Sequence, residues 1–192
     1  TKSLVTLKER ELNSGWAEAI KHAFLFDQGL LKKFQMQSKD IIRKKDPIFT
    51  EIIKRSVQIK AEIVSKDEFE KGTDRIKLNF GHTIGHSLEG LTEYGKLLHG
   101  EAVSIGMVVA TNISKNLNLI SNDTKNEIIS TLKQYGLPIN LTKGIDIKDS
   151  ELVVAFDKDR SDISGTASFM GAPAEFSVQF DWEKESVKAV GL

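Results

Sequence analysis

Residues 75–89, RIKLNFGHTIGHSLE, place the strongest constraint on what this chain can fold into. If this segment is helical, offsets of four, three, four and three positions put five polar side chains on one stripe: Arg75, Asn79, His82, His86 and Glu89. Such a stripe makes a poor core face, because each group would need a buried partner. Gly81 and Gly85 each destabilise a helix by about 1 kcal/mol relative to Ala, so their presence predicts close packing against this segment.

The histidines of this region suggest a metal site. His82 and His86 have H-x-x-x-H spacing, which can place two imidazoles on one ion. The metalloprotease motif has Glu directly after its first His, and this chain has Thr83 there. His99 opens the next predicted helix, so three histidines lie within 18 positions. Sequence pattern alone leaves a metal site and structural histidines as equal alternatives.

The rest of the pattern predicts a mainly α fold. The expected helices cover residues 16–26 (capped by Ser14), 28–38, a stretch from Pro47 to Lys60, 76–91, 99–116 and 124–135. After residue 150, β-forming residues alternate over 166–170 and 174–180, which predicts a small β-hairpin. We therefore expect one mostly helical domain over residues 1–192, with residues 150–192 as a β-containing appendage.

Composition excludes several classes of protein. Lys+Arg and Asp+Glu balance at 27 each, so no net charge favours nucleic acid or an anionic membrane. The chain has no cysteine, which rules out disulfides and thiolate metal sites and favours a cytoplasmic location. Its longest apolar run, residues 102–110, is far shorter than the roughly 20 residues that span a bilayer. No G-x-G-x-x-G fingerprint for a dinucleotide is present among the 14 glycines.

Two further groups of charged residues are less informative alone. Glu18 and Lys21 are spaced i,i+3 in a predicted helix, as in many surface ion pairs. Lys60 closes the helix that begins after Pro47, where a cation favours the helix C-terminus.

Taken together, these segments resemble the 3-dehydroquinate synthase family. Residues 14–21 resemble its S-G-x-A-E-x-I-K segment, and residues 60–64 and 67–70 resemble K-A-x-x-V and D-E-x-E. Residues 75–89 are similar to R-x-x-L-N-x-G-H-T-x-G-H-x-x-E, and residues 97–107 are similar to L-x-H-G-E-A-V-x-x-G-M. The order and spacing hold over residues 14–107, whereas the tail from Ser161 matches weakly.

The resemblance implies the helical C-terminal domain of the dehydroquinate synthase-like fold and assigns roles within it. Zn²⁺ or Co²⁺ would be held by Glu18, His82 and His99, which makes His86 a substrate- and phosphate-side residue instead of a ligand. The substrate-side set that it implies is His86, Lys21, Lys60, Arg75, Asn79, Glu70 and Lys158. Between Glu70 and Arg75 this chain has one residue more than the family's usual spacing. The family's D-K-K segment corresponds here to Asp157-Lys158-Asp159, which Arg160 follows.

The implied activity converts 3-deoxy-D-arabino-heptulosonate 7-phosphate to 3-dehydroquinate plus phosphate, a carbon–oxygen lyase step of the shikimate pathway. NAD would be held mostly by an N-terminal half that we do not find here, so we expect the 192-residue chain to be inactive alone. The expected partners are a small sugar acid phosphate and a second copy of the chain, as a homodimer. Other sugar phosphate cyclases are a rival, disfavoured by Asn79 and His86. A non-catalytic helical metal-binding module is the rival from another class.

Overall fold

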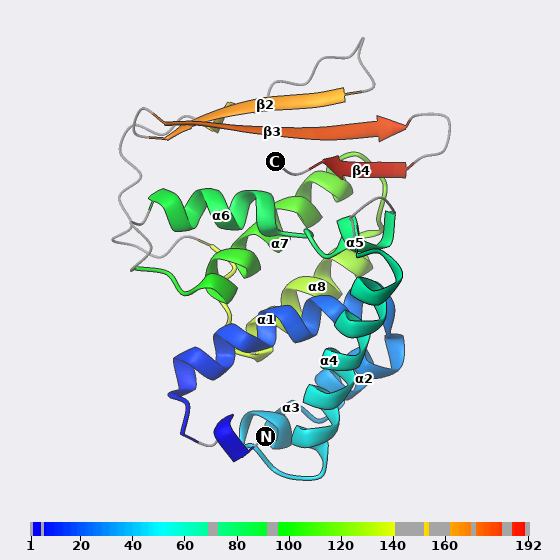
Figure 1. Cartoon of the computed structure of the whole chain (residues 1–192), viewed down its shortest axis with the longest axis vertical. Coiled ribbons are helices and arrows are strands. Elements are labelled where there is room, and N and C mark those ends of the chain that lie inside the picture. Colours follow the sequence, from blue (N-terminus) through cyan, green and yellow to red (C-terminus); the bar gives the residue numbers. More distant parts are fainter. Residues whose placement is uncertain are drawn as a thin grey trace.

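A computed structural model describes residues 2–4, 6–68, 73–91, 96–140, 152–153, 162–169, 172–181 and 186–190. Its elements, in chain order, are η1 (Lys2–Leu4), α1 (Glu9–Phe26), α2 (Gln28–Met36), α3 (Ser38–Ile42), α4 (Ile48–Lys66), α5 (Thr73–Lys77), α6 (His82–Leu91), α7 (His99–Asn116), α8 (Asn122–Gln134), β1 (Leu152–Val153), β2 (Asp162–Phe169), β3 (Ala172–Asp181) and β4 (Ser186–Val190) (Figure 1). The prediction of a mainly helical fold is confirmed. Among the described residues, no helix has the length and apolar character needed to cross a membrane.

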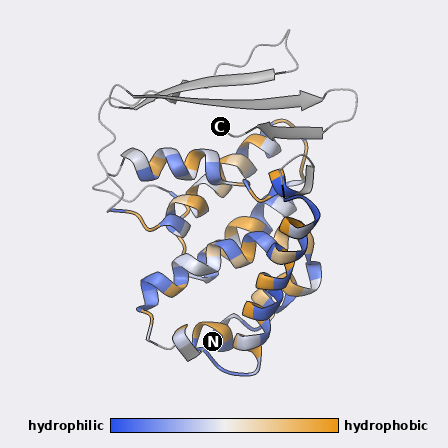
Figure 2. Cartoon of the chain, in the orientation of Figure 1, coloured by the Kyte–Doolittle hydropathy of each residue, from blue (hydrophilic) through white to orange (hydrophobic). Residues whose placement is uncertain are grey.

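Helix α1 is the centre of the helical body, and it packs against α2, α4, α7 and α8. Its apolar residues recur every three or four positions, so they form one buried face. Trp16 on that face meets three other rings edge-on, with centroids 5.8–6.0 Å away: Phe34, Phe49 and Tyr135. The helices of the bundle carry apolar and hydrophilic residues on different faces (Figure 2). This packing on four other helices fixes the position of α1 in the helical body.

The prediction of one helix over residues 76–91 is wrong in one respect, because a turn separates α5 from α6. Gly81 has φ +84°, a conformation that L side chains rarely adopt, and residues 78–81 form a turn before α6 begins. The same turn lets α7 approach closely, since a Cβ on Gly106 would lie 2.0 Å from the Gly81 carbonyl oxygen. Arg75 therefore belongs to α5, and the five-residue polar stripe is not one helix face.

Helix α7 begins directly against α1. A Cβ on Gly100 would lie 1.9 Å from the Ser14 carbonyl oxygen, and the Gly100 N–H donates to Ser14 Oγ over 3.0 Å. Ser14 was expected to cap a helix, but α1 already begins at Glu9 and Ser14 lies within it. Its hydroxyl instead holds the first turn of α7, next to His99.

The described strands form one antiparallel sheet in the order β1-β2-β3-β4. Strands β2 and β3 pair with Asp162 opposite Gln179 and Phe169 opposite Ala172. The sheet lies on the side of the helical body that carries α6 (Figure 1). The sequence predicted a smaller element, a hairpin of residues 166–170 and 174–180.

Candidate metal and substrate site

Three helices bring one carboxylate and two imidazoles together. Glu18 lies in α1, His82 is the first residue of α6, and His99 is the first residue of α7. One ligand atom from each lies within 4.8 Å of those from the other two, although 81 positions separate Glu18 from His99. His82 Nε2 is 3.5 Å from Glu18 Oε1, and the His82 and His99 ring centroids are 5.3 Å apart. We call these three residues the Glu18–His82–His99 cluster.

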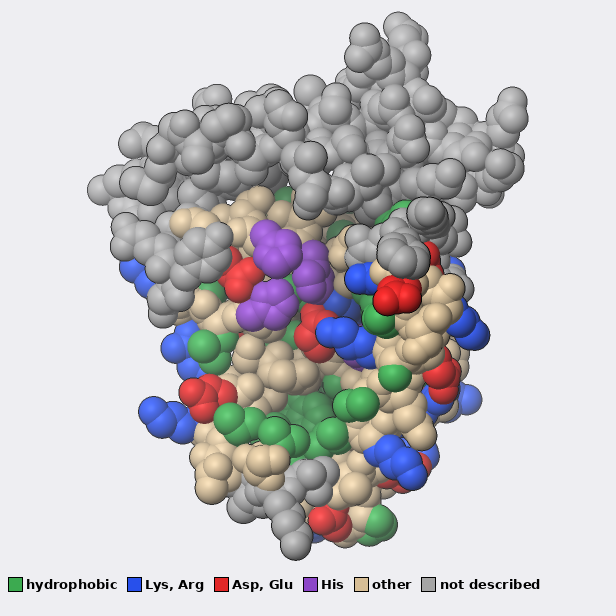
Figure 3. Space-filling view, in the orientation of Figure 1, with side chains coloured by type: hydrophobic (Ala, Val, Ile, Leu, Met, Phe, Trp, Pro, Cys, Tyr) green, Lys and Arg blue, Asp and Glu red, His purple; other side chains and the backbone are tan. Residues whose placement is uncertain are grey.

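The close helix contacts explain why these side chains meet. His82 follows Gly81, whose carbonyl touches α7 at Gly106, and His99 precedes Gly100, which touches α1 at Ser14. Small residues at both crossings bring the backbones close together, so side chains at the helix starts converge. On the surface, histidine side chains form one patch on the face shown in Figure 3.

A buried lysine sets the charge of Glu18. The Lys21 side chain is 1% exposed, and its Nζ donates to Glu18 Oε1 over 2.9 Å and to Oε2 over 3.1 Å. Burial by itself raises the pKa of Glu18, but the charge and hydrogen bonds of Lys21 outweigh burial and the pKa is lowered. Burial lowers the pKa of Lys21, and Glu18 opposes that change. The carboxylate is therefore available as an anionic ligand at neutral pH.

His82 is held as a neutral imidazole. Burial first, and the nearby Lys21 charge second, lower its pKa to about 4. Its Nδ1 is 3.4 Å from the Phe80 carbonyl oxygen and 3.4 Å from Lys21 Nζ, while Nε2 faces Glu18. A histidine must be neutral to bind a metal ion, so this environment favours the ligand form.

The cluster fits a divalent transition metal. One carboxylate oxygen and two imidazole nitrogens are a donor set that suits Zn²⁺ and its chemical relatives. Ligands about 2.0–2.1 Å from a tetrahedral ion lie about 3.3 Å from one another. The 3.5 Å contact between His82 and Glu18 is already near that spacing, and the others are within 4.8 Å.

His86 lies beside the cluster and faces outward. Its ring centroid is 5.4 Å from that of His82 and 5.8 Å from that of His99, and its side chain is 65% exposed. Its Nδ1 is 3.1 Å from Glu89 Oε2. Glu89 also reaches His99, which makes a second group of donor atoms within 4.8 Å: His86, Glu89 and His99. In the sequence, Glu89 belongs to the predicted polar stripe but has no predicted role; its i+3 spacing from His86 was the available signal.

The cations predicted on the substrate side differ in position. Lys60 is exposed on α4, and its charge acts on the pKa of Lys21 and of His22, so it lies on the same side of the bundle. Arg75 Nη1 donates to the carbonyl oxygens of Asp67 (3.0 Å) and Glu68 (2.5 Å), beyond the end of α4. The structure thus brings Lys21 to the Glu18–His82–His99 cluster, while these contacts of Arg75 tie it to residues 67–68.

Asn79 is half-buried in the turn before α6, and its carbonyl oxygen accepts from the His82 N–H over 2.8 Å. That contact helps to set the start of α6. Glu70, Lys158 and Arg160 lie outside the described residues.

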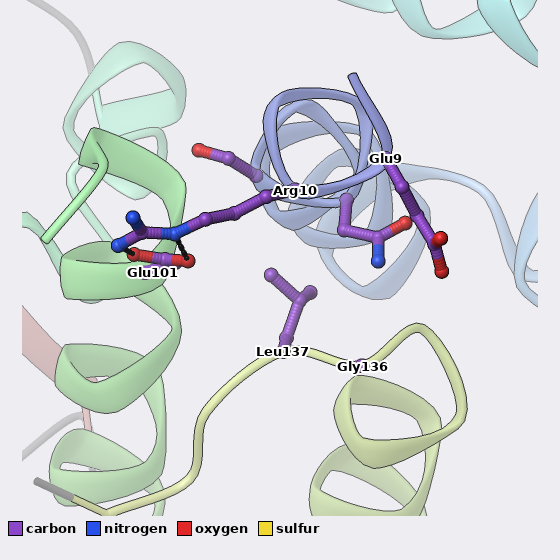
Figure 4. A pocket seen from close by; sticks show the side chains of 7 residues that line it. Glu9, Arg10, Glu101, Gly136 and Leu137 are labelled. Atoms are coloured by element: carbon purple, nitrogen blue, oxygen red, sulfur yellow. Dashed lines mark hydrogen bonds and ion pairs between the residues drawn. The ribbon is translucent and has the colours of Figure 1, made fainter. Parts of the chain in front are cut away.

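A cavity of about 330 Å³ lies elsewhere, at the start of α1 (Figure 4). It is lined by Glu9, Arg10, Asn13, Ser14, Glu101, Gly136 and Leu137, none of which is a predicted site residue. Arg10 donates to both Glu101 oxygens over 2.7 Å, and Glu101 Oε2 accepts from the Leu98 N–H. These contacts hold the first turn of α7 in place, and with it His99. We therefore interpret the residues that line this cavity as structural.

Solved structures place this fold among the sugar phosphate cyclases. A 2-epi-5-epi-valiolone synthase from Streptomyces hygroscopicus, solved with NAD⁺ and Zn²⁺, matches 74% of this chain and 39% of its own, with a TM-score of 0.66 and 25% identity. A 2-deoxy-scyllo-inosose synthase, solved with carbaglucose-6-phosphate, NAD⁺ and Co²⁺, matches 97% and 51%, with a TM-score of 0.62 and 22% identity.

The sequence comparisons are more specific. The family described as 3-dehydroquinate synthase C-terminal matches residues 15–161, and the chain belongs to that family. The 3-dehydroquinate synthase of Thermodesulfovibrio yellowstonii is 37% identical over 190 residues, which cover 98% of this chain and 52% of that protein. The one from Caldanaerobacter subterraneus is 41% identical over 158 residues, covering 82% and 44%. The chain thus spans about half the length of these curated relatives.

Proposed function

We propose that this chain is the metal- and substrate-binding half of a 3-dehydroquinate synthase, which converts 3-deoxy-D-arabino-heptulosonate 7-phosphate to 3-dehydroquinate and phosphate. The observation that supports this most directly is the convergence of Glu18, His82 and His99 in a chain of this family. The rest of the enzyme would hold most of the NAD, as the relatives are about twice as long.

Glu18, His82 and His99 would hold Zn²⁺ or Co²⁺, the ions with which the two structural neighbours were solved. A metal ion held there would supply Lewis-acid chemistry for the substrate hydroxyl that is oxidised and for the ketone that forms. The protein prepares this site by keeping Glu18 ionised through Lys21 and His82 neutral through burial.

The substrate carries a carboxylate and a phosphate, so its site needs cations. Lys21 and Lys60 offer ammonium groups on the side of the metal cluster, and Arg75 offers a guanidinium near the end of α4. Asn79 would present its amide from the turn that sets His82. Glu70 and Lys158 complete the set that the family resemblance implies.

His86 would bind and exchange a proton with the phosphate. Its exposed ring lies against the two histidines of the metal cluster, so a substrate on the metal would lie within its reach. Glu89 engages its Nδ1, which leaves Nε2 for a phosphate oxygen.

A chimera tests this function. This chain would be joined to the part of the T. yellowstonii enzyme that it does not match, and phosphate release would be followed with NAD, Zn²⁺ and the heptulosonate phosphate. We expect phosphate release, 3-dehydroquinate as the product by NMR, and loss of both in the His82→Ala chimera. A different carbocycle would favour another cyclase activity. No turnover from a chimera that folds and binds NAD and metal would favour the non-catalytic module.

A further inference from the structure

Glu89 lies between two histidines that have different proposed roles. It is in α6, seven positions after His82 and three after His86, and its side chain is only 12% exposed. One oxygen, Oε2, is 3.1 Å from His86 Nδ1. His99 Nδ1, at the start of α7, is 3.1 Å from Oε1 and 3.2 Å from Oε2.

The chemistry of a carboxylate decides what these contacts mean. A carboxylate only accepts hydrogen bonds, so an imidazole nitrogen that bonds to it must carry the proton. Glu89 therefore favours the Nδ1–H tautomer of His86 and of His99. In both rings this leaves the lone pair on Nε2. A neutral imidazole binds a metal through the nitrogen that has no proton.

We propose that Glu89 is a positioning residue that fixes the tautomer and ring orientation of His99, so that Nε2 is directed to the ion, and that it orients His86 through the same carboxylate. The inference rests on the proposed metal site. It also ties the two helices, because one carboxylate of α6 holds the first residue of α7. A carboxylate behind a ligating histidine commonly orients the ring, and its loss weakens metal affinity about 10- to 100-fold.

The geometry allows one rival role. Donor atoms of His86, Glu89 and His99 lie within 4.8 Å of one another, so Glu89 could itself be a ligand of an ion. The positioning role is favoured because each contact has the length of an ordinary N–H···O hydrogen bond. In the positioning role, His99 also remains a ligand together with Glu18 and His82, whose donor atoms already lie within 4.8 Å of one another. The two roles differ in how many ions the chain binds.

Titration with Co²⁺ distinguishes the positioning role of Glu89 from the ligand role. Isothermal titration of the 192-residue chain is expected to show one Co²⁺ per chain, with the same stoichiometry and about 10- to 100-fold weaker binding in Glu89→Ala. Glu89→Gln is expected to fall between them, since its amide oxygen still accepts from one imidazole. Glu51→Gln, the same change on an exposed carboxylate outside the cluster, is expected to match the wild type.

A spectroscopic readout stands apart from metal binding. Long-range ¹⁵N–¹H spectra of the metal-free chain are expected to show His99 as the Nδ1–H tautomer, and Glu89→Ala as a mixture. Glu89→Ala that binds Co²⁺ within twofold of wild type, or that keeps the Nδ1–H tautomer, overturns the proposal. So does a wild-type chain that binds two ions and loses one with Glu89. If Glu89→Ala does not fold, Glu89→Gln decides by its Co²⁺ affinity alone, and binding within twofold of wild type overturns the proposal.

Failure of the proposed function looks different. A wild-type chain that binds no Co²⁺ contradicts the metal site, while the tautomer of His99 still reports whether Glu89 positions it.

Discussion

One added methyl group at Gly100 should open the candidate site. In Gly100→Ala the new Cβ would lie 1.9 Å from the Ser14 carbonyl oxygen, 2.6 Å from its carbonyl carbon and 2.8 Å from its Oγ. The two nearest of these atoms belong to the backbone, so rotation of the Ser14 side chain cannot relieve the clash. The start of α7 must therefore move from α1 by about 1 Å or more, to restore an ordinary contact.

The magnitude follows from two losses. Overpacking of this kind lowers the free energy of unfolding by about 1–3 kcal/mol. The hydrogen bond from the Gly100 N–H to Ser14 Oγ is lost as well, about 1 kcal/mol. Together they lower the melting temperature by roughly 5–15 °C for a chain of this size. His99 precedes Gly100 and Glu18 lies one turn beyond Ser14, so the same movement should weaken Co²⁺ binding.

The matched control is Gly15→Ala. A Cβ at Gly15 meets nothing within 4 Å, and Ala is favoured over Gly inside a helix by about 0.5–1 kcal/mol. Gly15→Ala should therefore be slightly more stable and keep its metal affinity. Urea unfolding and Co²⁺ titration of both variants make the comparison. A Gly100→Ala chain as stable as wild type, with unchanged Co²⁺ affinity, would refute the close approach of α7 to α1.

Two buried groups give further predictions. His22 lies buried with Nδ1 2.9 Å from Ser56 Oγ, and burial lowers its pKa to about 4 from an ordinary value of 6.5. Between pH 4 and 6.5 the unfolded chain binds more protons than the folded chain, so the free energy of unfolding decreases as the pH is lowered. This group alone lowers it by about 2 kcal/mol at pH 5. In urea unfolding, His22→Gln should flatten this part of the pH profile, and an unchanged slope contradicts the lowered pKa of His22. The Tyr135 hydroxyl donates to the Phe34 carbonyl oxygen over 2.8 Å in the core, so Tyr135→Phe should lower the free energy of unfolding by about 1–2 kcal/mol, and equal urea midpoints would count against that bond.

The sequence predicted helices best where one apolar face decides the structure. The range His99–Asn116 was predicted to the residue, because the mostly apolar run of residues 102–110 lies within it. The segment around Gly81 was predicted as one helix, since its 3.6-residue spacing is continuous. A positive φ at one glycine depends on what packs there, and that partner, Gly106, lies 25 positions away.

The site shows a similar division. The H-x-x-x-H pattern suggested His82 and His86 as a pair of metal ligands, whereas resemblance to a family pointed to Glu18, His82 and His99. The structure brings the donor atoms of these three residues within 4.8 Å of one another. No periodicity connects residues 81 positions apart; they meet because small residues let three helix backbones come close. Glu89 was visible as a polar residue of the stripe, yet its contact with His99 depends on the α6–α7 packing.

We propose above that Glu18, His82 and His99 hold one divalent ion. Anomalous diffraction from crystals of the chain grown with Co²⁺ tests it most directly. We expect a single strong peak about 2.0–2.2 Å from one Glu18 oxygen, one His82 nitrogen and His99 Nε2. A peak bonded to Glu89 and to the Nδ1 atoms of His86 and His99, or no peak at the cluster at a saturating Co²⁺ concentration, would contradict it.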